Sequence, residues 1–196
     1  LVPSKVSSSA TVTAIAWSEI DGGRQDGLVA AAWGGGAKGT ASEYTLQVWH
    51  VSVAPNGTAG VPLRAQLVCR YSGCEAIKSL AWSGIRLAVC CPSSIRILLI
   101  RDAFEIDGAA ARATALVDAS VLDLSPSSNN KWSECQFVRD GIDRSGSVLI
   151  GMSRSDVSFF VCSAEFWRET EDSAEADLPD RPQPRQVSIS RQEMNQ

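Results

Sequence analysis

A five-residue phrase occurs twice in this chain, and each copy begins a series of short apolar segments separated by turn residues. The two copies are Ala14-Ile15-Ala16-Trp17-Ser18 and Ser79-Leu80-Ala81-Trp82-Ser83. Apolar and β-branched residues that alternate over this length predict β-strands. Their recurrence at this spacing indicates a repeat architecture, in which each unit has an apolar face that only a neighbouring unit can cover.

Three sets of strands follow from this pattern, about eleven strands in all. The sets lie within residues 11–73, 76–124 and 132–162, and clusters of Gly, Pro, Asn and Ser separate their strands. Such clusters mark turns between extended segments. Residues 1–10 are interpreted as an N-terminal extension. The predicted fold class is therefore all-β.

Residues 163–196 differ from the rest of the chain in composition. They hold 4 basic and 8 acidic side chains, whereas residues 1–162 hold 14 of each, so the excess negative charge lies in the tail. Ser163 is a candidate N-cap for a short helix over residues 164–176. The Pro-containing segment that follows has too little apolar content to form a core. We predict a short helix or a disordered tail here.

The order of these strands resembles the WD40 class of β-propeller, in which a blade strand ends in a Trp-Asp pair. Leu46-Gln47-Val48-Trp49 stands at that place, although His50 follows where the family has Asp. The second and third units have Leu98-Leu99 and Phe159-Phe160 there, and no unit has the family's Gly-His pair. The resemblance covers about residues 10–165 and implies a degenerate propeller of about three four-stranded blades. The alternative is an all-β sandwich.

A closed propeller has about four to eight blades, so three leave two ends uncovered. We expect the chain to be a segment of a longer polypeptide or to complete its ring with another chain. The resemblance implies a non-enzymatic scaffold for protein–protein interaction within a multi-subunit complex. Its partners would be proteins that complete or cap the open propeller, held by the blades and their inserted loops. A small-ligand-binding or enzymatic propeller is the alternative function.

Aromatic residues divide into two predicted groups. Those at comparable strand positions in successive units are predicted to form the core between blades: Trp17, Trp49, Trp82 and Phe137. Trp and Arg residues near loops or chain ends are candidates for partner contact, because these residue types dominate interface hot spots. The candidates are Trp132, Arg139 and Trp167.

The polar residues present no arrangement typical of catalysis or of a bound cofactor or metal. His50 is the only histidine, which leaves few bases to activate a nucleophile. Gly39 separates Lys38 from Thr40, so the glycine-rich loop lacks the contiguous Gly-Lys-Thr of a phosphate-binding loop. The six cysteines lie mostly within apolar runs and lack zinc-ligand spacing. We predict no enzymatic activity, no cofactor and no metal.

Charge and hydropathy indicate which class of partner such a scaffold binds and in which compartment we expect it. A neutral body without a basic stripe argues against nucleic acid as the main partner, because phosphate backbones require clustered positive charge. No run of about 18 apolar residues and no signal segment occurs in the sequence. We therefore expect an intracellular protein, cytoplasmic or nuclear, without membrane insertion.

Overall fold

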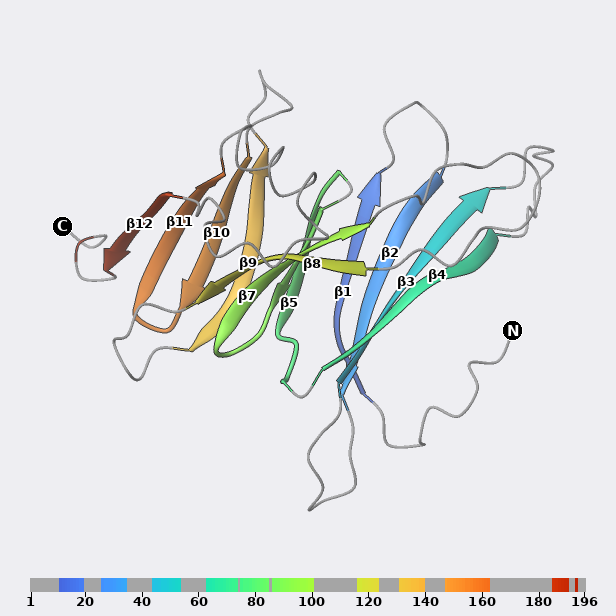
Figure 1. Ribbon diagram of the computed structural model, residues 1–196, viewed down its shortest axis with the longest axis horizontal. Helices are drawn as coiled ribbons and strands as arrows, with labels where there is room; N and C mark the ends of the chain where they lie inside the picture. The colour runs from blue at the N-terminus through green and yellow to red at the C-terminus, as the bar shows by residue number, and fades with distance from the viewer. Residues whose placement is uncertain are drawn as a thin grey trace, which may run out of the picture.

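The computed structural model describes residues 11–19, 26–34, 44–53, 63–73, 75–84, 86–100, 116–123, 131–139, 147–162, 185–190 and 193. Within them the chain forms twelve β-strands and no α-helix. The strands build three antiparallel sheets of four strands each (Figure 1). The predicted all-β class is confirmed, and the strands form three sheets, one more than the two layers of a β-sandwich.

In every sheet the strands lie side by side in chain order. The first sheet contains β1 (Thr11–Glu19), β2 (Asp26–Gly34), β3 (Tyr44–Val53) and β4 (Leu63–Gly73). The middle sheet contains β5 (Ser79–Ser83), β6 (Arg86–Cys90), β7 (Ser94–Ile100) and β8 (Leu116–Asp123). The third sheet contains β9 (Trp132–Arg139), β10 (Ser147–Ser153), β11 (Asp156–Cys162) and β12 (Arg185–Ser190).

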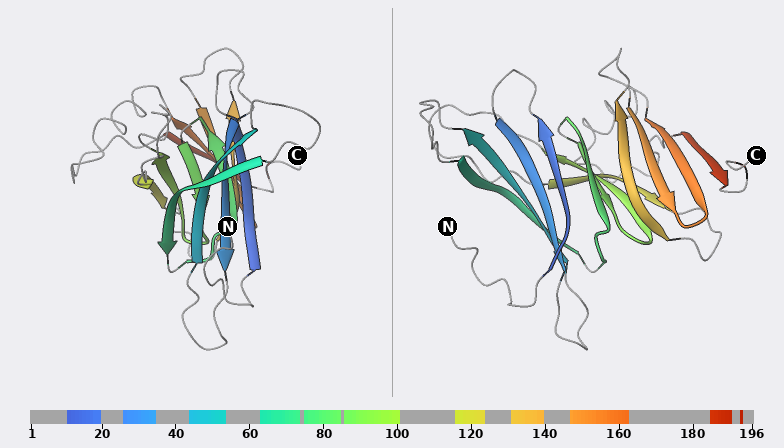
Figure 2. Two further views of the ribbon diagram at one scale, coloured as in Figure 1. Left: turned by 90° about the vertical axis from the view of Figure 1, so that its right-hand side faces the viewer. Right: turned by 180° about the vertical axis from the view of Figure 1, so that it is seen from behind.

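The three sheets stack face to face, with the middle sheet between the other two (Figures 1 and 2). The first strands of the sheets, β1, β5 and β9, are neighbours in this stack. The first and third sheets lie at its opposite ends, so the arrangement is open (Figure 1).

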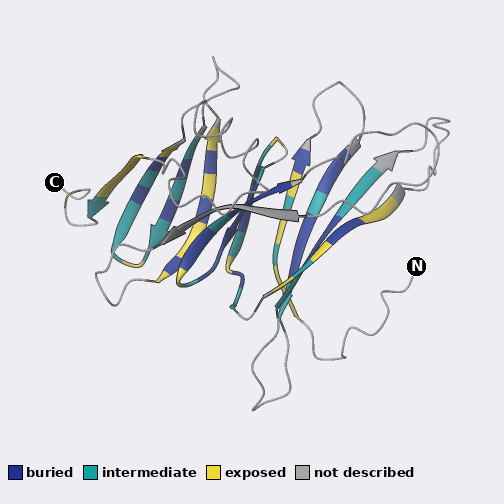
Figure 3. Cartoon of the chain, viewed as in Figure 1, coloured by how far each residue is buried: buried dark blue, intermediate teal, exposed yellow. Residues whose placement is uncertain are grey.

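Two apolar cores hold the stack together, one on each face of the middle sheet. Leu87 and Val89 of β6 pack in the core shared with the first sheet. Ala88 and Cys90, which alternate with them, pack in the core shared with the third sheet. Successive side chains of a strand point to opposite faces, so a continuous apolar run such as β6 suits a strand covered on both sides. Figure 3 shows this burial along the middle sheet.

Hydrogen bonds between the first strands add to this packing. The Trp82 Nε1–H of β5 donates to the backbone oxygen of Ala16 in β1, at 3.2 Å. The backbone N–H of Cys135 in β9 donates to Ser79 Oγ of β5, at 2.7 Å. Because β1 and β9 are edge strands, these bonds use backbone groups that their own sheets leave unpaired. Strand β5 is thus hydrogen-bonded to β1 of the first sheet and to β9 of the third.

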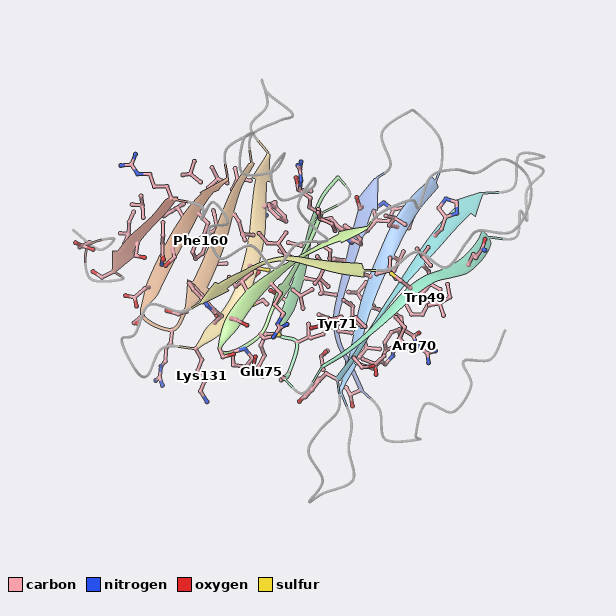
Figure 4. The ribbon with its side chains drawn as sticks, viewed as in Figure 1. Trp49, Arg70, Tyr71, Glu75, Lys131 and Phe160 are labelled. Carbon is pink, nitrogen blue, oxygen red and sulfur yellow. The ribbon has the colours of Figure 1, made fainter. Side chains whose placement is uncertain are left out.

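Further from the first strands, a polar contact joins the first and middle sheets. Arg96 Nη1 of β7 donates to the hydroxyl oxygen of Tyr71 in β4, at 3.1 Å. Glu75, between the two sheets in the chain, accepts hydrogen bonds from the backbone N–H and the hydroxyl of Ser93 at 3.0 and 2.6 Å. Tyr71 and Glu75 are labelled in Figure 4. These contacts fix the β6–β7 turn against the segment that leads into the middle sheet.

The prediction for the tail needs a correction. Residues 185–190 are neither helical nor disordered: they form β12, which pairs with β11. The segment alternates polar and apolar residues from Gln186 to Ser190, and the exposed edge of β11 supplies the ladder that this pattern needs. The predicted helix over residues 164–176 lies outside the described residues. In the described part of the chain, no helix has the length and apolar character needed to cross a membrane.

Candidate interaction surfaces

Each sheet has two faces, which we name by their direction along the stack. The N-side face of the middle sheet, with Leu80 and Trp82, packs on the first sheet, and its C-side face, with Ala81 and Ala88, packs on the third. By the same rule, the N-side face of the first sheet and the C-side face of the third are its two outer faces. The seven exposed large hydrophobic side chains among the described residues all belong to strands of the end sheets.

One aromatic position recurs on the N-side face of every first strand. Trp17 in β1, Trp82 in β5 and Phe137 in β9 occupy it, as the repeated phrase and the alternation of side chains require. Trp82 is 8% exposed and Phe137 is 7% exposed, since a preceding sheet covers each. Trp17 is 50% exposed, so its predicted place in the core between blades is wrong. No described sheet lies on its side of the stack.

A row of apolar side chains crosses all four strands on the N-side face of the first sheet. Strand register places Trp17 opposite Val29, Val29 opposite Trp49, and Trp49 opposite Leu67. Leu67 and, beside the row, Ile15 are exposed, whereas Trp49 is half-buried. Trp49, predicted as core between blades, thus belongs to this outer face (Figure 4). The row spans the full width of the sheet.

The tryptophans of this face lie close to their neighbours. The rings of Trp33 and Trp49 meet edge to face, with centroids 5.2 Å apart. The indole of Trp17 lies so close over Gly27 that a Cβ at that position would overlap it. Large aromatic rings with few rotatable bonds lose little conformational entropy on binding, which suits them to protein interfaces.

A polar pair borders this row toward the edge strand β4. Gln47 is buried, and its side-chain oxygen, when turned toward Arg70, accepts from Nη2 and Nε of that guanidinium at 3.1 Å each. Arg70 is exposed on β4 (Figure 4). Apolar centres with a polar rim are the usual composition of protein–protein interfaces.

The C-side face of the third sheet is the second exposed apolar surface. In its upper row, Val138 of β9, Val148 of β10 and Val161 of β11 lie opposite one another. In the next row, Ile150, Phe159 and Val187 do the same across β10, β11 and β12. Val138, Val161 and Val187 are among the exposed large hydrophobics.

Strand β12 carries different types of side chain on its two faces. Its apolar residues, Val187 and Ile189, lie opposite Phe159 and Val157 and therefore on the C-side face. Its N-side positions are polar, and Ser188 shares a 2.8 Å hydrogen bond with the buried hydroxyl of Ser158. The strand is thus apolar toward the outside of the stack, whereas a sheet face in solvent usually carries polar side chains.

The three residues predicted for partner contact are not brought together. Trp132 is 3% exposed and meets Phe160 edge to face at 5.8 Å, inside the core between the middle and third sheets. Its prediction as a surface residue is therefore wrong. A β-bulge at Ser133 inserts one extra residue, which turns Trp132 onto the same face as Cys135. Arg139 ends β9, and its side chain, like all of Trp167, lies outside the described residues.

The buried thiols pack as part of the cores. Cys90 and Cys135 share the core between the middle and third sheets, and Ser79 Oγ lies 3.5 Å from the Cys135 sulfur. A hydrogen bond with Cys135, together with burial, raises the pKa of Cys90. Burial raises the pKa of Cys69, in the other core, to about 11. The same hydrogen bond with Cys90 lowers the pKa of Cys135. The Cys69 and Cys90 thiols, whose pKa is raised, stay protonated at neutral pH and are poor nucleophiles or metal ligands.

Comparison of the chain with protein-family models and with curated proteins finds no match in either. The assignment of the two outer faces as candidate interaction surfaces therefore rests on their geometry alone. The sequence predicted that an open stack of three units leaves two ends uncovered, but it did not place Trp17 and Trp49 at such an end. It treated the repeated aromatic residues as equivalent in burial, although only their strand positions are equivalent. The signal was present: Ile15 and Trp17 lie on one side of β1, and the alanines 14 and 16 on the other.

Proposed function

We propose that this chain is a WD40-like β-propeller segment that works as a non-enzymatic scaffold for protein–protein interaction inside a multi-subunit complex. The observation that carries the proposal is the pair of outer apolar faces, each four strands wide, at the ends of a stack whose middle sheet is covered on both sides. Exposed apolar areas of this kind mark interaction sites on folded proteins.

The sequential strand order supports the propeller interpretation. Each blade of a propeller is a four-stranded antiparallel sheet whose first strand lies near the common axis. Here β1, β5 and β9 are neighbours, and every sheet continues outward in chain order. The protein partners of the scaffold are those that cover the outer faces, and the connecting loops vary what the blades present.

Co-purification with substituted faces tests this function. The tagged chain is recovered from native extract as wild type, as Trp17→Glu and as Val161→Glu, and bound chains are identified by mass spectrometry. Lys131→Glu is the matched control, since Lys131 is exposed but belongs to neither apolar row. We expect partners that the wild type and the control retain and that at least one face variant loses. Capture of the same chains by all four proteins, or of none by the wild type, would contradict the proposal.

A further inference from the structure

We propose that a second copy of this chain covers the exposed N-side face of the first sheet with the C-side face of its own third sheet. Two copies then close into one ring of sheets. The inference rests on the proposed function, because it names the partner that completes the open stack.

The two junctions inside the chain show what such a face takes as its cover. In the first, Trp82 on an N-side face packs with Ala14 and Ala16 on the C-side face of the preceding sheet. In the second, Phe137 on an N-side face packs with Ala81 and Ala88. Both junctions therefore join an N-side face that bears an aromatic ring on its first strand to a C-side face of mainly small or aliphatic side chains. Tyr71 on the edge strand β4 is the one aromatic side chain of such a C-side face in the first junction.

Trp17 stands at the same position on the first sheet, so the cover it requires is a C-side face. Among the described sheets, only the third has an uncovered C-side face, and the exposed valines of that face are aliphatic. Phe159 is its one aromatic side chain among the described residues. Joining these two outer faces repeats the established junctions once more.

The width of the apolar row selects a sheet over a helix as the cover. The row runs from Trp17 on β1 to Leu67 on β4, across four strands spaced about 4.8 Å apart. An α-helix about 10 Å across covers only about two of them. The third sheet of a second copy has four strands as well, so it covers the row completely.

The charged side chains of the two faces are compatible with this contact. Arg70 lies on β4, Glu134 on β9 and Arg185 on β12, and each of these is an edge strand. They therefore fall at the rim of the junction, where water remains and charge is tolerated. The central strands β2, β3, β10 and β11 present uncharged residues in the rows described above.

One hydrogen bond across the new junction can be named. Trp82 Nε1 donates to the oxygen of Ala16, the residue that precedes the equivalent tryptophan in the neighbouring first strand. In β9 the residue that precedes the equivalent aromatic is Gln136. We therefore expect Trp17 Nε1 to donate to the backbone oxygen of Gln136 in the second copy.

The number of copies in the ring follows from the type of contact and from the number of sheets that a closed ring needs. A contact between two different faces of one chain gives a closed ring or an open fibre. Two copies bring twice three sheets, which lies within the range of about four to eight at which radial β-sheet rings close.

Sedimentation equilibrium of the purified chain over a range of concentrations tests the inference. We expect the wild type and Lys131→Glu to form dimers, and Trp17→Glu and Val161→Glu each to be monomeric. Ile15→Lys, on the same face as Trp17, is a second variant, and circular dichroism checks that each variant retains its β-structure. An equimolar mixture of Trp17→Glu and Val161→Glu should recover part of the dimer, because one mixed junction keeps two intact faces.

The other outcomes are equally decisive. A monomeric wild type overturns the inference, and so does a wild type that grows into fibres. A Val161→Glu variant that stays dimeric while Trp17→Glu is monomeric indicates a symmetric contact between two N-side faces, which also overturns it. A monomeric wild type that still captures another protein through Trp17 leaves the proposed function standing while removing the second copy.

Discussion

The middle sheet and the two end sheets contain the same number of strands in the same order, yet they differ in what their faces touch. Side chains of β6 and β7 are buried on both faces, whereas β1, β4, β11 and β12 each expose large apolar side chains on one face. The repeated phrase does not separate the two kinds of sheet, because it occurs in β1 and in β5 alike. The difference in burial therefore comes from position in the stack.

A matched pair of leucine truncations should give the largest contrast between the two regions. Leu98→Ala removes a fully buried side chain of the middle sheet, and we expect it to lower the free energy of unfolding by about 3 to 5 kcal/mol. Leu67→Ala, on the exposed N-side face, should cost less than about 1 kcal/mol. Denaturant unfolding at a protein concentration low enough to keep the chain monomeric measures both. Equal losses under these conditions would show that Leu67 is covered within the single chain.

Two glycines that lie beside tryptophan rings offer a sharper comparison. A Cβ at Gly151 would lie 2.8 Å from both Ile95 Cδ1 and Trp132 Cζ3, inside a packed core. Gly151→Ala should therefore cost about 1 to 3 kcal/mol of unfolding free energy. Gly27→Ala also pushes against a ring, but Trp17 is half exposed and can turn away toward solvent. We expect the Gly27 variant of the monomeric chain to unfold close to wild type, and thermal melts of both variants at a concentration that keeps the chain monomeric decide the point.

The smallest effect concerns pH and the covered face of the first sheet. Cys69 has a pKa raised from 9.0 to about 11 by burial in the core that joins this sheet to the middle one. Between these values the unfolded thiol loses its proton while the folded one keeps it, so stability falls as pH rises. We expect about 1 to 2 kcal/mol to be lost between about pH 9 and pH 11 on this account.

Cys69→Val is the variant that isolates this contribution. Its unfolding free energy should fall less steeply than that of the wild type over the same pH interval, since both proteins share every other titrating group. Equilibrium unfolding at several alkaline pH values gives the two slopes. Parallel slopes would mean that the Cys69 thiol reaches solvent in the folded protein.

Several parts of the fold could be predicted from local pattern alone. Alternation and turn residues located the first eleven strands, because a half-buried strand imposes a period of two on its own sequence. The repeated phrase that contains Trp17 and Trp82 indicated that the units stack, and the structure contains three such sheets. These features depend on residues that are close together in the sequence, so they can be predicted before any tertiary contact is known.

The uncovered ends of the stack could be predicted from the number of units, but the residues that form the candidate surfaces could not. Trp17 and Trp82 stand in the same five-residue context, yet a sheet covers one and none covers the other. The position of Trp132 near a loop predicts a surface residue, but a bulge at Ser133 turns its side chain inward. That bulge depends on the pairing of β9 with β10, which the local sequence does not show. The last strand, Arg185–Ser190, was hidden by the acidic composition around it and exists through its ladder with β11.

The sequence by itself determined which segments extend, where they turn and which side of each strand is apolar, since these follow from backbone sterics and residue spacing. Only the tertiary structure decided which apolar faces are covered, because burial is a property of two surfaces meeting and the second surface is remote in the chain. Trp17 is the clearest example: its residue type and strand position predict a covered site, yet the structure leaves it half exposed.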